Sequence, residues 1–214
     1  MAYIVLKKVS KKIKNNYVLS NINLSLEKGK IYGLAGQNGS GKTMLLRAIA
    51  GLMKTDGEVL INGKKVGSSE QKETIGIIIE NIGLFNDLSA KENLMLLNSF
   101  DDKKISEEDI CTAIKSVGLD YESKLPYKKF SLGMKQKLCI AQAIMSHPDI
   151  LLLDEPTNAL DEKSVDDFRN LIKSENEKGS TIIIASHNKE DLNILCQKVF
   201  KIKNGCLEAE NGEE

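Results

Sequence analysis

Apolar residues recur along the chain with two different periods, and the change of period predicts the arrangement of elements. Near the N-terminus, residues 3–9, 22–26 and 30–35 alternate or cluster apolar positions as strands do. The stretches GEVLING and TIGIIIE predict two further strands, which follow a helix-like segment, MLLRAIAGL. The first part of the chain therefore predicts a sheet with one helix.

From residue 81 to residue 147 the pattern is that of helices. Ser89 with Glu92, and Ser106 with Asp109, have the spacing of capping boxes at helix N-termini. Because these helices interrupt a series of strands, residues 81–147 are predicted to form a helical lobe inserted into the sheet domain.

Strands resume after residue 147 with DILLLD and TIIIAS, which are separated by a helix pattern over residues 165–178. Since strands that alternate with helices form parallel sheets, we expect a mostly parallel sheet. The stretch KIKNGCLE predicts a β-hairpin with Asn204 and Gly205 at its turn, followed by an acidic tail. Together these patterns predict an α/β domain whose core comprises residues 1–80 and 148–214.

The composition is that of an ordinary globular protein, because 214 residues with 41% hydrophobic content can bury a full core. The 30 basic and 30 acidic residues cancel, so no overall basic field favours a nucleic-acid partner, and none is expected. The apolar runs are too short to cross a bilayer, and the N-terminus lacks the core of a signal peptide. The four cysteines lack metal-ligand spacing, and buried free thiols are expected at Cys111 and Cys139, as suits a reducing cytosol.

The stretch GQNGSGKT, residues 36–43, has the spacing of a phosphate-binding loop. Its glycines let the backbone curl round an anion, and the helix that starts near Lys42 directs its positive dipole end at the same charge. Lys42 adds a point charge, and the hydroxyl of Thr43 is a hard oxygen ligand for Mg²⁺. A glycine-rich turn before an ordinary helix is the alternative, but the position between strand and helix favours a nucleotide. The residues expected to bind it are Gly36, Gln37, Asn38, Gly39, Ser40, Gly41, Lys42, Thr43 and Met44.

Two carboxylates, Asp154 and Glu155, directly follow the apolar run ILLL. This position is the mouth of a buried parallel strand, where α/β proteins bind ligands. Asp154 is expected to hold Mg²⁺ through its water shell, and Glu155 to polarise the attacking water as a general base. A strand that ends in a solvated acidic turn is the alternative, but the glycine loop elsewhere in the chain favours the metal.

His187 follows the next apolar run, TIIIAS. A single histidine is more often a satisfied polar residue than a catalytic one. A donor at the end of this strand could nevertheless reach the γ-phosphate and hold the water and Glu155 in line. The next residues, NKED, have the N-K-x-D spacing of the guanine-reading motif of GTPases, but the accompanying D-x-x-G pattern has Thr157 in place of glycine. We therefore interpret NKED as the polar start of a helix.

Four motifs occur in the order of those of the ATP-binding-cassette (ABC) ATPases, which the chain resembles over nearly its whole length: GQNGSGKT, FSLGMKQKL, ILLLDEPTNALD and SH. FSLGMKQKL is similar to the LSGGQ signature of that family and keeps Ser131 and Gly133. The form SLGMKQ resembles that of drug and peptide exporters, including the bacitracin and lantibiotic self-protection type. A plain helix N-terminus with Ser131 as its cap is compatible with this interpretation.

The resemblance implies an α/β fold: a P-loop NTPase core with a mostly parallel sheet, an N-terminal antiparallel β lobe and an inserted helical lobe. It implies that Ser131 and Gly133 bind the ATP held by a second cassette, and that Asp161 communicates across that dimer. Glu80 falls where the family most often has a glutamine that contacts Mg²⁺ or the attacking water. Tyr17 is the nearest substitute for the aromatic residue that stacks on adenine.

The chain is therefore expected to be an ATPase that uses ATP and Mg²⁺. The expected catalytic residues are Lys42, Glu155 and His187, and the expected metal site comprises Thr43, Asp154 and Glu80. The resemblance implies that hydrolysis powers a separate integral membrane permease, an exporter of drugs, peptides or lipids. It also implies a dimer with a second ABC ATPase chain, an identical one in the simplest case, at the cytoplasmic inner face of the cell membrane.

Two alternatives stay open at this point. A non-transport ABC ATPase that acts on DNA or ribosomes is the rival function, although such proteins usually carry two cassettes, coiled-coil arms or basic extensions, and none is evident here. The apolar residues Leu84 and Phe85 lie in a turn-rich stretch. They are expected either to receive a helix of the membrane partner or to pack under the helical lobe.

Overall fold

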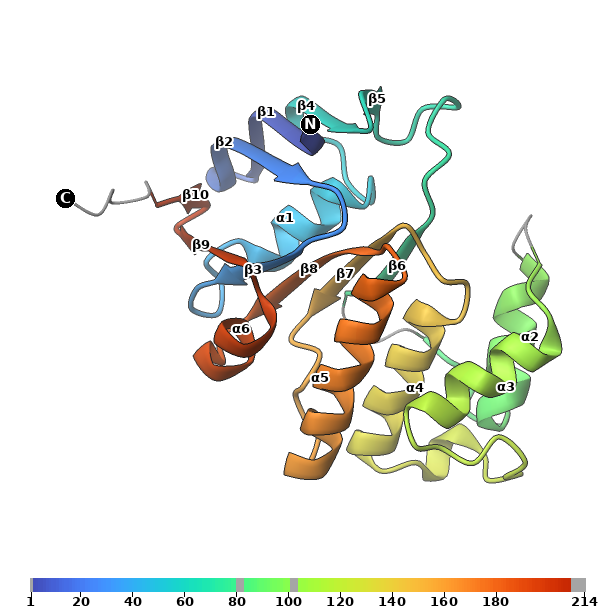
Figure 1. Ribbon diagram of the computed structural model, residues 1–214. Helices are drawn as coiled ribbons and strands as arrows, with labels where there is room; N and C mark the ends of the chain where they lie inside the picture. Colours follow the sequence, from blue (N-terminus) through green and yellow to red (C-terminus); the bar gives the residue numbers. More distant parts are fainter. Residues whose placement is uncertain (1, 80–82, 101–103, 209–214) are drawn as a thin grey trace.

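The computed structural model describes residues 2–79, 83–100 and 104–208, which form two sheets and two groups of helices (Figure 1). The antiparallel sheet has the strand order β2-β1-β4-β5 and the larger sheet the order β10-β9-β3-β8-β7-β6. The strands are β1 (Ala2–Ile13), β2 (Asn16–Glu27), β3 (Ile31–Ala35), β4 (Asp56–Ile61), β5 (Lys64–Lys65), β6 (Ile75–Ile78), β7 (Ile150–Asp154), β8 (Thr181–Ser186), β9 (Lys198–Lys203) and β10 (Cys206–Leu207). The helices are α1 (Lys42–Ile49), α2 (Ala90–Phe100), α3 (Glu107–Ser116), α4 (Leu132–Ile144), α5 (Glu162–Glu177) and α6 (Lys189–Leu195), with one 3₁₀ turn, Tyr127–Lys129.

The first two strands are longer than their apolar pattern predicts. β1 and β2 form one antiparallel hairpin that pairs Lys12 with Tyr17 and Ile13 with Asn16 near its tip. The expected strands, residues 3–9 and 22–26, cover only its inner part. The tip was missed because it is exposed and polar, and because bulges at Lys8 and Asn21, both with positive φ, break the alternation of faces.

The larger sheet is parallel except at its edge, as predicted. β3, β6, β7, β8 and β9 run in the same direction, and β10 pairs with β9 through the predicted hairpin at Asn204 and Gly205, both with positive φ. Ala35 pairs with Ser186, and Asp154 with Ala185. Since parallel strands end at one edge, the residues that follow β3, β7 and β8 come together there.

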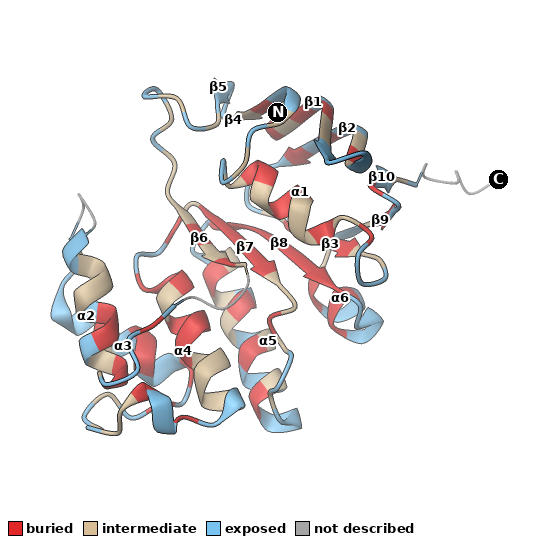
Figure 2. Ribbon diagram, turned by 180° about the vertical axis from the view of Figure 1, so that it is seen from behind, coloured by how far each residue is buried: buried red, intermediate tan, exposed pale blue. Residues whose placement is uncertain are grey.

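The two faces of this sheet explain why its central strands are continuous apolar runs. Leu151 and Leu153 of β7 point into a core formed with helices α2 to α6, whereas Ile150 and Leu152 point into a second core formed with α1 and the antiparallel sheet. Figure 2 shows β7 and β8 buried over their length between these layers. A strand covered on both faces needs no polar alternation.

Helices α2, α3 and α4 begin where their caps predict, whereas α5 begins earlier than expected. Glu92 Oε2 accepts from the backbone N–H of Ser89, and Asp109 closes the same reciprocal box with Ser106. α4 begins after Ser131, whose hydroxyl oxygen accepts from the N–H of Met134 at 3.2 Å. α5 begins at Glu162, three residues before the predicted position, because the side chain of Asp161 caps it.

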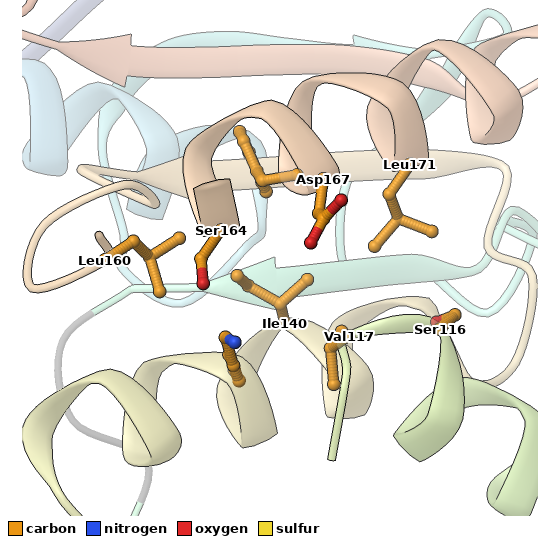
Figure 3. Close-up of a pocket in the computed structure, with 9 residues that line it drawn as sticks. Ser116, Val117, Ile140, Leu160, Ser164, Asp167 and Leu171 are labelled. Atoms are coloured by element: carbon orange, nitrogen blue, oxygen red, sulfur yellow. The ribbon is translucent and has the colours of Figure 1, made fainter. Parts of the chain in front are cut away.

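The helical region packs tightly against the rest of the chain. Val117 at the end of α3, Ile140 of α4 and Leu160 before α5 surround a cavity of about 10 Å³, room for at most one water (Figure 3). Side chains of α2, α3 and α4 belong to the same apolar cluster as β7 and α5. The division into a core and a lobe of residues 81–147 stays a prediction, and the apolar cluster is continuous across that boundary.

The cysteines are all free, and only part of the expectation about their burial is confirmed. Cys139 is buried, whereas Cys111 is half-exposed on α3, so the prediction of a buried thiol there is wrong. Within residues 2–79, 83–100 and 104–208, no helix combines the length and the hydropathy that spanning a bilayer requires.

Candidate active site

Residues 36–41 form the loop that connects β3 to α1 at the edge where the parallel strands end, and residues 42 and 43 begin the helix. A Cβ atom on Gly36 would lie 2.5 Å from the carbonyl oxygen of Ile202 and from Ser40 Oγ, so no larger residue fits. Gly41 has φ 113° and immediately precedes α1. These two glycines therefore let the loop pass close to β9 and turn into the helix.

The N-terminus of α1 is open to an anion. Gly41 caps the helix without a side-chain hydrogen bond, and the first turn contains no acidic residue. The N–H of Ser40 donates to the carbonyl of Gln37 at 3.1 Å, so this N–H is already used within the loop. The remaining N–H groups of the loop and the helix dipole leave a phosphate site at this end.

Lys42 is the cation of this site, and its side chain is only 5% exposed. Its Nζ donates to the carbonyl oxygens of Gly36 at 2.7 Å and Gln37 at 3.3 Å. The same ammonium group lies 3.5 Å from Glu155 Oε1. The structure therefore brings Lys42 and Glu155 together, as the sequence predicted.

Thr43 and Asp154 also meet, since the hydroxyl of Thr43 donates to Asp154 Oδ2. This pair of hard oxygen donors beside a phosphate site fits Mg²⁺, which usually takes one or two protein oxygens and completes its shell with phosphate and water. In the described part of the chain, no three His, Cys, Asp or Glu side chains gather as a metal cage would need. Glu80, the third predicted ligand, lies outside the described residues.

Glu155 and His187 form the polar centre of the site. His187 Nδ1 lies 2.8 Å from Glu155 Oε2, and the backbone N–H of His187 donates to Glu155 Oε1 at 3.2 Å. Ser186 Oγ donates to the same carboxylate at 3.3 Å. Glu155 also has φ 46°, a strained value for a residue with a side chain. These contacts favour the catalytic interpretation of His187 over that of an isolated polar residue.

A groove of about 460 Å³ opens beside the loop. It is lined by residues 36–40 of the loop, by His187 and Lys189, and by the end of β9. Tyr17 lies at the tip of the β1–β2 hairpin, is 58% exposed, and has Lys12 Nζ 5.5 Å from its ring centre. The next residue, Val18, has its carbonyl oxygen within 2.9 Å of a Cβ placed on Gly41, so the exposed ring belongs to a hairpin that borders the loop.

Ser131 and Gly133 lie at the N-terminus of α4, away from this cluster. Ser131 Oγ accepts from the N–H of Met134 within α4, and neither Ser131 nor Gly133 lines the groove beside residues 36–40. A Cβ on Gly133 would lie 3.0 Å from the carbonyl oxygen of Ala159. Within one chain the predicted signature therefore faces the segment after Glu155, while Asp161 serves as the cap of α5.

Residues 188–191 are the start of a helix, as interpreted from the sequence. Asn188 caps α6 by accepting from the N–H of Glu190 at 2.9 Å. Asp191 is buried against Arg169 of α5, so its carboxylate is not available to read a guanine base. Sequence reasoning missed Arg169, because no local pattern marks its contact with a carboxylate on another helix.

Comparison with known proteins places this site in a family. The family model described as "ABC transporter" matches residues 19–158. The chain belongs to the ABC transporter family. It is 49% identical over 203 residues to the ABC transporter ATP-binding protein YybJ of Bacillus subtilis, covering 94% of this chain and 92% of that protein. It is 37% identical over 189 residues to the lantibiotic transport ATP-binding protein SrtF of Streptococcus pyogenes, covering 88% and 81%.

The fold and the activity agree with this membership. The structure matches the ATP-binding cassette MJ0796, whose dimer was solved in a post-hydrolysis state with ADP and Pi, with a TM-score of 0.85, 27% identity, and 96% and 97% of the two chains covered. The resemblance and the α/β cassette fold expected from the sequence are thus confirmed. The chain is an ATP-binding subunit of an ABC transporter and an ATPase, rather than the non-transport rival.

Proposed function

We propose that this chain powers the export of peptides or related drugs by a membrane permease, through ATP hydrolysis at the site that contains Lys42, Glu155 and His187. The observation that carries the proposal is the convergence of these three side chains at the open end of α1. Similarity to a lantibiotic transport protein supports the cargo class. The permease would place the chain at the cytoplasmic face of the cell membrane.

The proposed chemistry assigns one task to each residue. Lys42 and the loop bind the β- and γ-phosphates, and Thr43 with Asp154 would hold Mg²⁺, which when bound neutralises phosphate charge. Glu155 accepts a proton from water as the water oxygen bonds to the γ-phosphorus and the bond to the β–γ bridging oxygen breaks. His187 fixes the carboxylate of Glu155 through the 2.8 Å contact.

A second cassette would complete each site. Ser131 and Gly133 offer a hydroxyl and a helix N-terminus, and neither residue lines the groove beside residues 36–40 of the same chain. The γ-phosphate bound by another chain is the natural charge for that helix end. The dimer of the similar cassette MJ0796 supports this arrangement, and two identical chains would make both sites alike.

A loop beside the signature suits contact with the permease. Phe85 is 51% exposed, whereas Leu84 is buried and so packs within the chain. Asn93 fixes this loop, since its side chain accepts from the N–H of Phe85 at 2.7 Å and donates to the carbonyls of Phe85 and Leu88. A rigid loop with one exposed aromatic ring supports docking of a permease helix.

The Glu155→Gln variant tests the site and the dimer together. Loss of the base should abolish turnover while ATP still binds, so that the ATP-bound dimer accumulates and is seen by light scattering. Adding Ser131→Arg should return that protein to monomer, because the bulk and charge enter the interface. Wild-type turnover in Glu155→Gln would refute Glu155 as the base, and a monomer at saturating ATP would refute the homodimer.

A further inference from the structure

The two segments that carry Glu155 and His187 are joined at a second point, away from their own contact. Thr157, two residues after Glu155, donates its hydroxyl to Asp191 Oδ2 at 2.8 Å. Asp191 lies in the first turn of α6, the helix that starts just after His187. The segment that carries Glu155 and the segment that carries His187 are therefore joined by two side-chain contacts.

Asp191 is a buried carboxylate, and both of its oxygens accept hydrogen bonds. It is 1% exposed. Its Oδ1 accepts from Arg169 Nε at 3.0 Å and Nη2 at 2.6 Å, which leaves Oδ2 for Thr157. These hydrogen bonds raise the pKa of Arg169 above its usual value. A buried charged group needs such a partner, so the two hydrogen bonds from Arg169 hold the Asp191 carboxylate with Oδ2 directed at Thr157.

The backbone conformation of Glu155 is an independent reason to expect a contact that holds the turn after this residue. Its φ of 46° belongs to a region that is unfavourable for a residue with a side chain. Such a conformation is kept only where the surroundings over-determine it. On the N-terminal side, the N–H of Glu155 donates to the carbonyl of Ala185 at 2.8 Å. On the C-terminal side, the bond from Thr157 to Asp191 holds the turn.

We propose that Thr157, Asp191 and Arg169 are positioning residues that fix the Glu155 carboxylate against His187 for ATP hydrolysis. The inference rests on the proposed roles of Glu155 and His187. Arg169 comes from α5 and Asp191 from α6, which lie side by side on one face of the sheet (Figure 1). The packing of these two helices therefore affects the positions of Glu155 and His187.

The test is the steady-state ATPase kinetics of the full chain with substitutions at Thr157. Thr157→Val keeps the shape but removes the donor, and should lower kcat roughly ten- to a hundredfold, since small misplacements of reacting groups have such effects. KM for ATP should change less than twofold, because residues 36–43 are untouched. Thr157→Ser keeps the hydroxyl and should restore kcat.

The matched control is Asp166→Asn. Asp166 contacts Arg169 Nη1 at 3.1 Å but is exposed and does not reach Thr157. If the contacts of Arg169 only stabilise α5, Asp166→Asn and Thr157→Val should have similar effects on kcat and on the melting temperature. That result overturns the proposal. A kcat for Thr157→Val within twofold of wild type, or no rescue by Thr157→Ser, also overturns it.

Asp191→Asn, which keeps an oxygen acceptor but removes the charge, gives a second measurement. It should lower kcat while KM for ATP changes less than twofold, because the Glu155 carboxylate is no longer held against His187. An unchanged kcat, or a rise in KM that matches the fall in kcat, overturns the proposal. Glu155→Gln, assayed beside it, separates the role of Glu155 as the base from the positioning role of Thr157, Asp191 and Arg169. Loss of turnover in Glu155→Gln with normal turnover in Thr157→Val refutes the positioning role alone. Wild-type turnover in Glu155→Gln refutes both roles.

Discussion

Gly76 of β6 lies against the backbone of α4, the helix that begins after Ser131, and Gly76→Ala tests this close approach. A Cβ at this position in β6 would lie 2.0 Å from the carbonyl oxygen of Ala143 in α4 and 2.8 Å from Pro148 Cγ. Real Cβ contacts essentially never fall below 3.0 Å, so β6 or α4 must move by about 1 Å. The obstacle is backbone and cannot rotate away.

The expected cost follows from this overlap. Over-packing that moves backbone costs about 3 kcal/mol, and the lower chain entropy of alanine in the unfolded state returns about 1 kcal/mol. The net loss of about 2 kcal/mol should lower the melting temperature of a chain of this size by roughly 4–8 °C. Urea unfolding should show a lower midpoint with an unchanged m-value.

Gly83→Ala is the matched control, because a Cβ there meets no atom within 4 Å. It should leave the free energy of unfolding unchanged or slightly raised. If Gly76→Ala is as stable as Gly83→Ala, β6 and α4 are not in the close contact described here, and the packing that positions α4 would have to be different.

Two further predictions concern pH and the permease. Hydrogen bonds from Ser89, Ser106 and Ser164 lower the pKa values of Glu92, Asp109 and Asp161 below the usual 4.5 or 3.8. The ionised carboxylates stabilise the fold above those values, so the melting temperature should fall as the pH drops below about 4.5. It should fall less steeply in Glu92→Gln, and equal slopes would count against a stabilising contact between Ser89 and Glu92. Phe85→Ser should weaken co-purification with the permease and transport while the ATPase activity of the free chain persists, and unchanged co-purification and transport would exclude docking through Phe85.

The sequence was most informative where one local pattern decides the structure. The parallel strands were predicted because ILLL and TIIIAS fill two cores at once, and the helix starts because their capping residues lie within a few positions of one another. The tip of the β1–β2 hairpin was missed because its paired residues, such as Lys12, are exposed and do not alternate apolar and polar positions. Periodicity carries no signal for such a segment.

The residues of the candidate site differ in the same way, because a local pattern predicts some of them and not others. Lys42, Thr43, Asp154, Glu155 and His187 were predicted because each follows directly from a strand end or a motif spacing, and the structure brings them together. The bond between Arg169 and Asp191 joins two helices whose packing no local pattern reveals. An arginine on an amphipathic helix is indistinguishable from a solvated one until its neighbour is known.

The strained backbone of Glu155 connects these observations. A relaxed extended residue would continue β7 and carry the carboxylate along the strand direction, whereas φ 46° turns the chain sharply after Asp154. Asp154 thus stays in the strand and reaches Thr43, while Glu155 reaches Lys42 and His187. Two adjacent carboxylates are thereby given different partners, one suited to hold a metal and the other to accept a proton. Any contact that keeps this turn closed, including that between Thr157 and Asp191, therefore acts on the separation of the two roles.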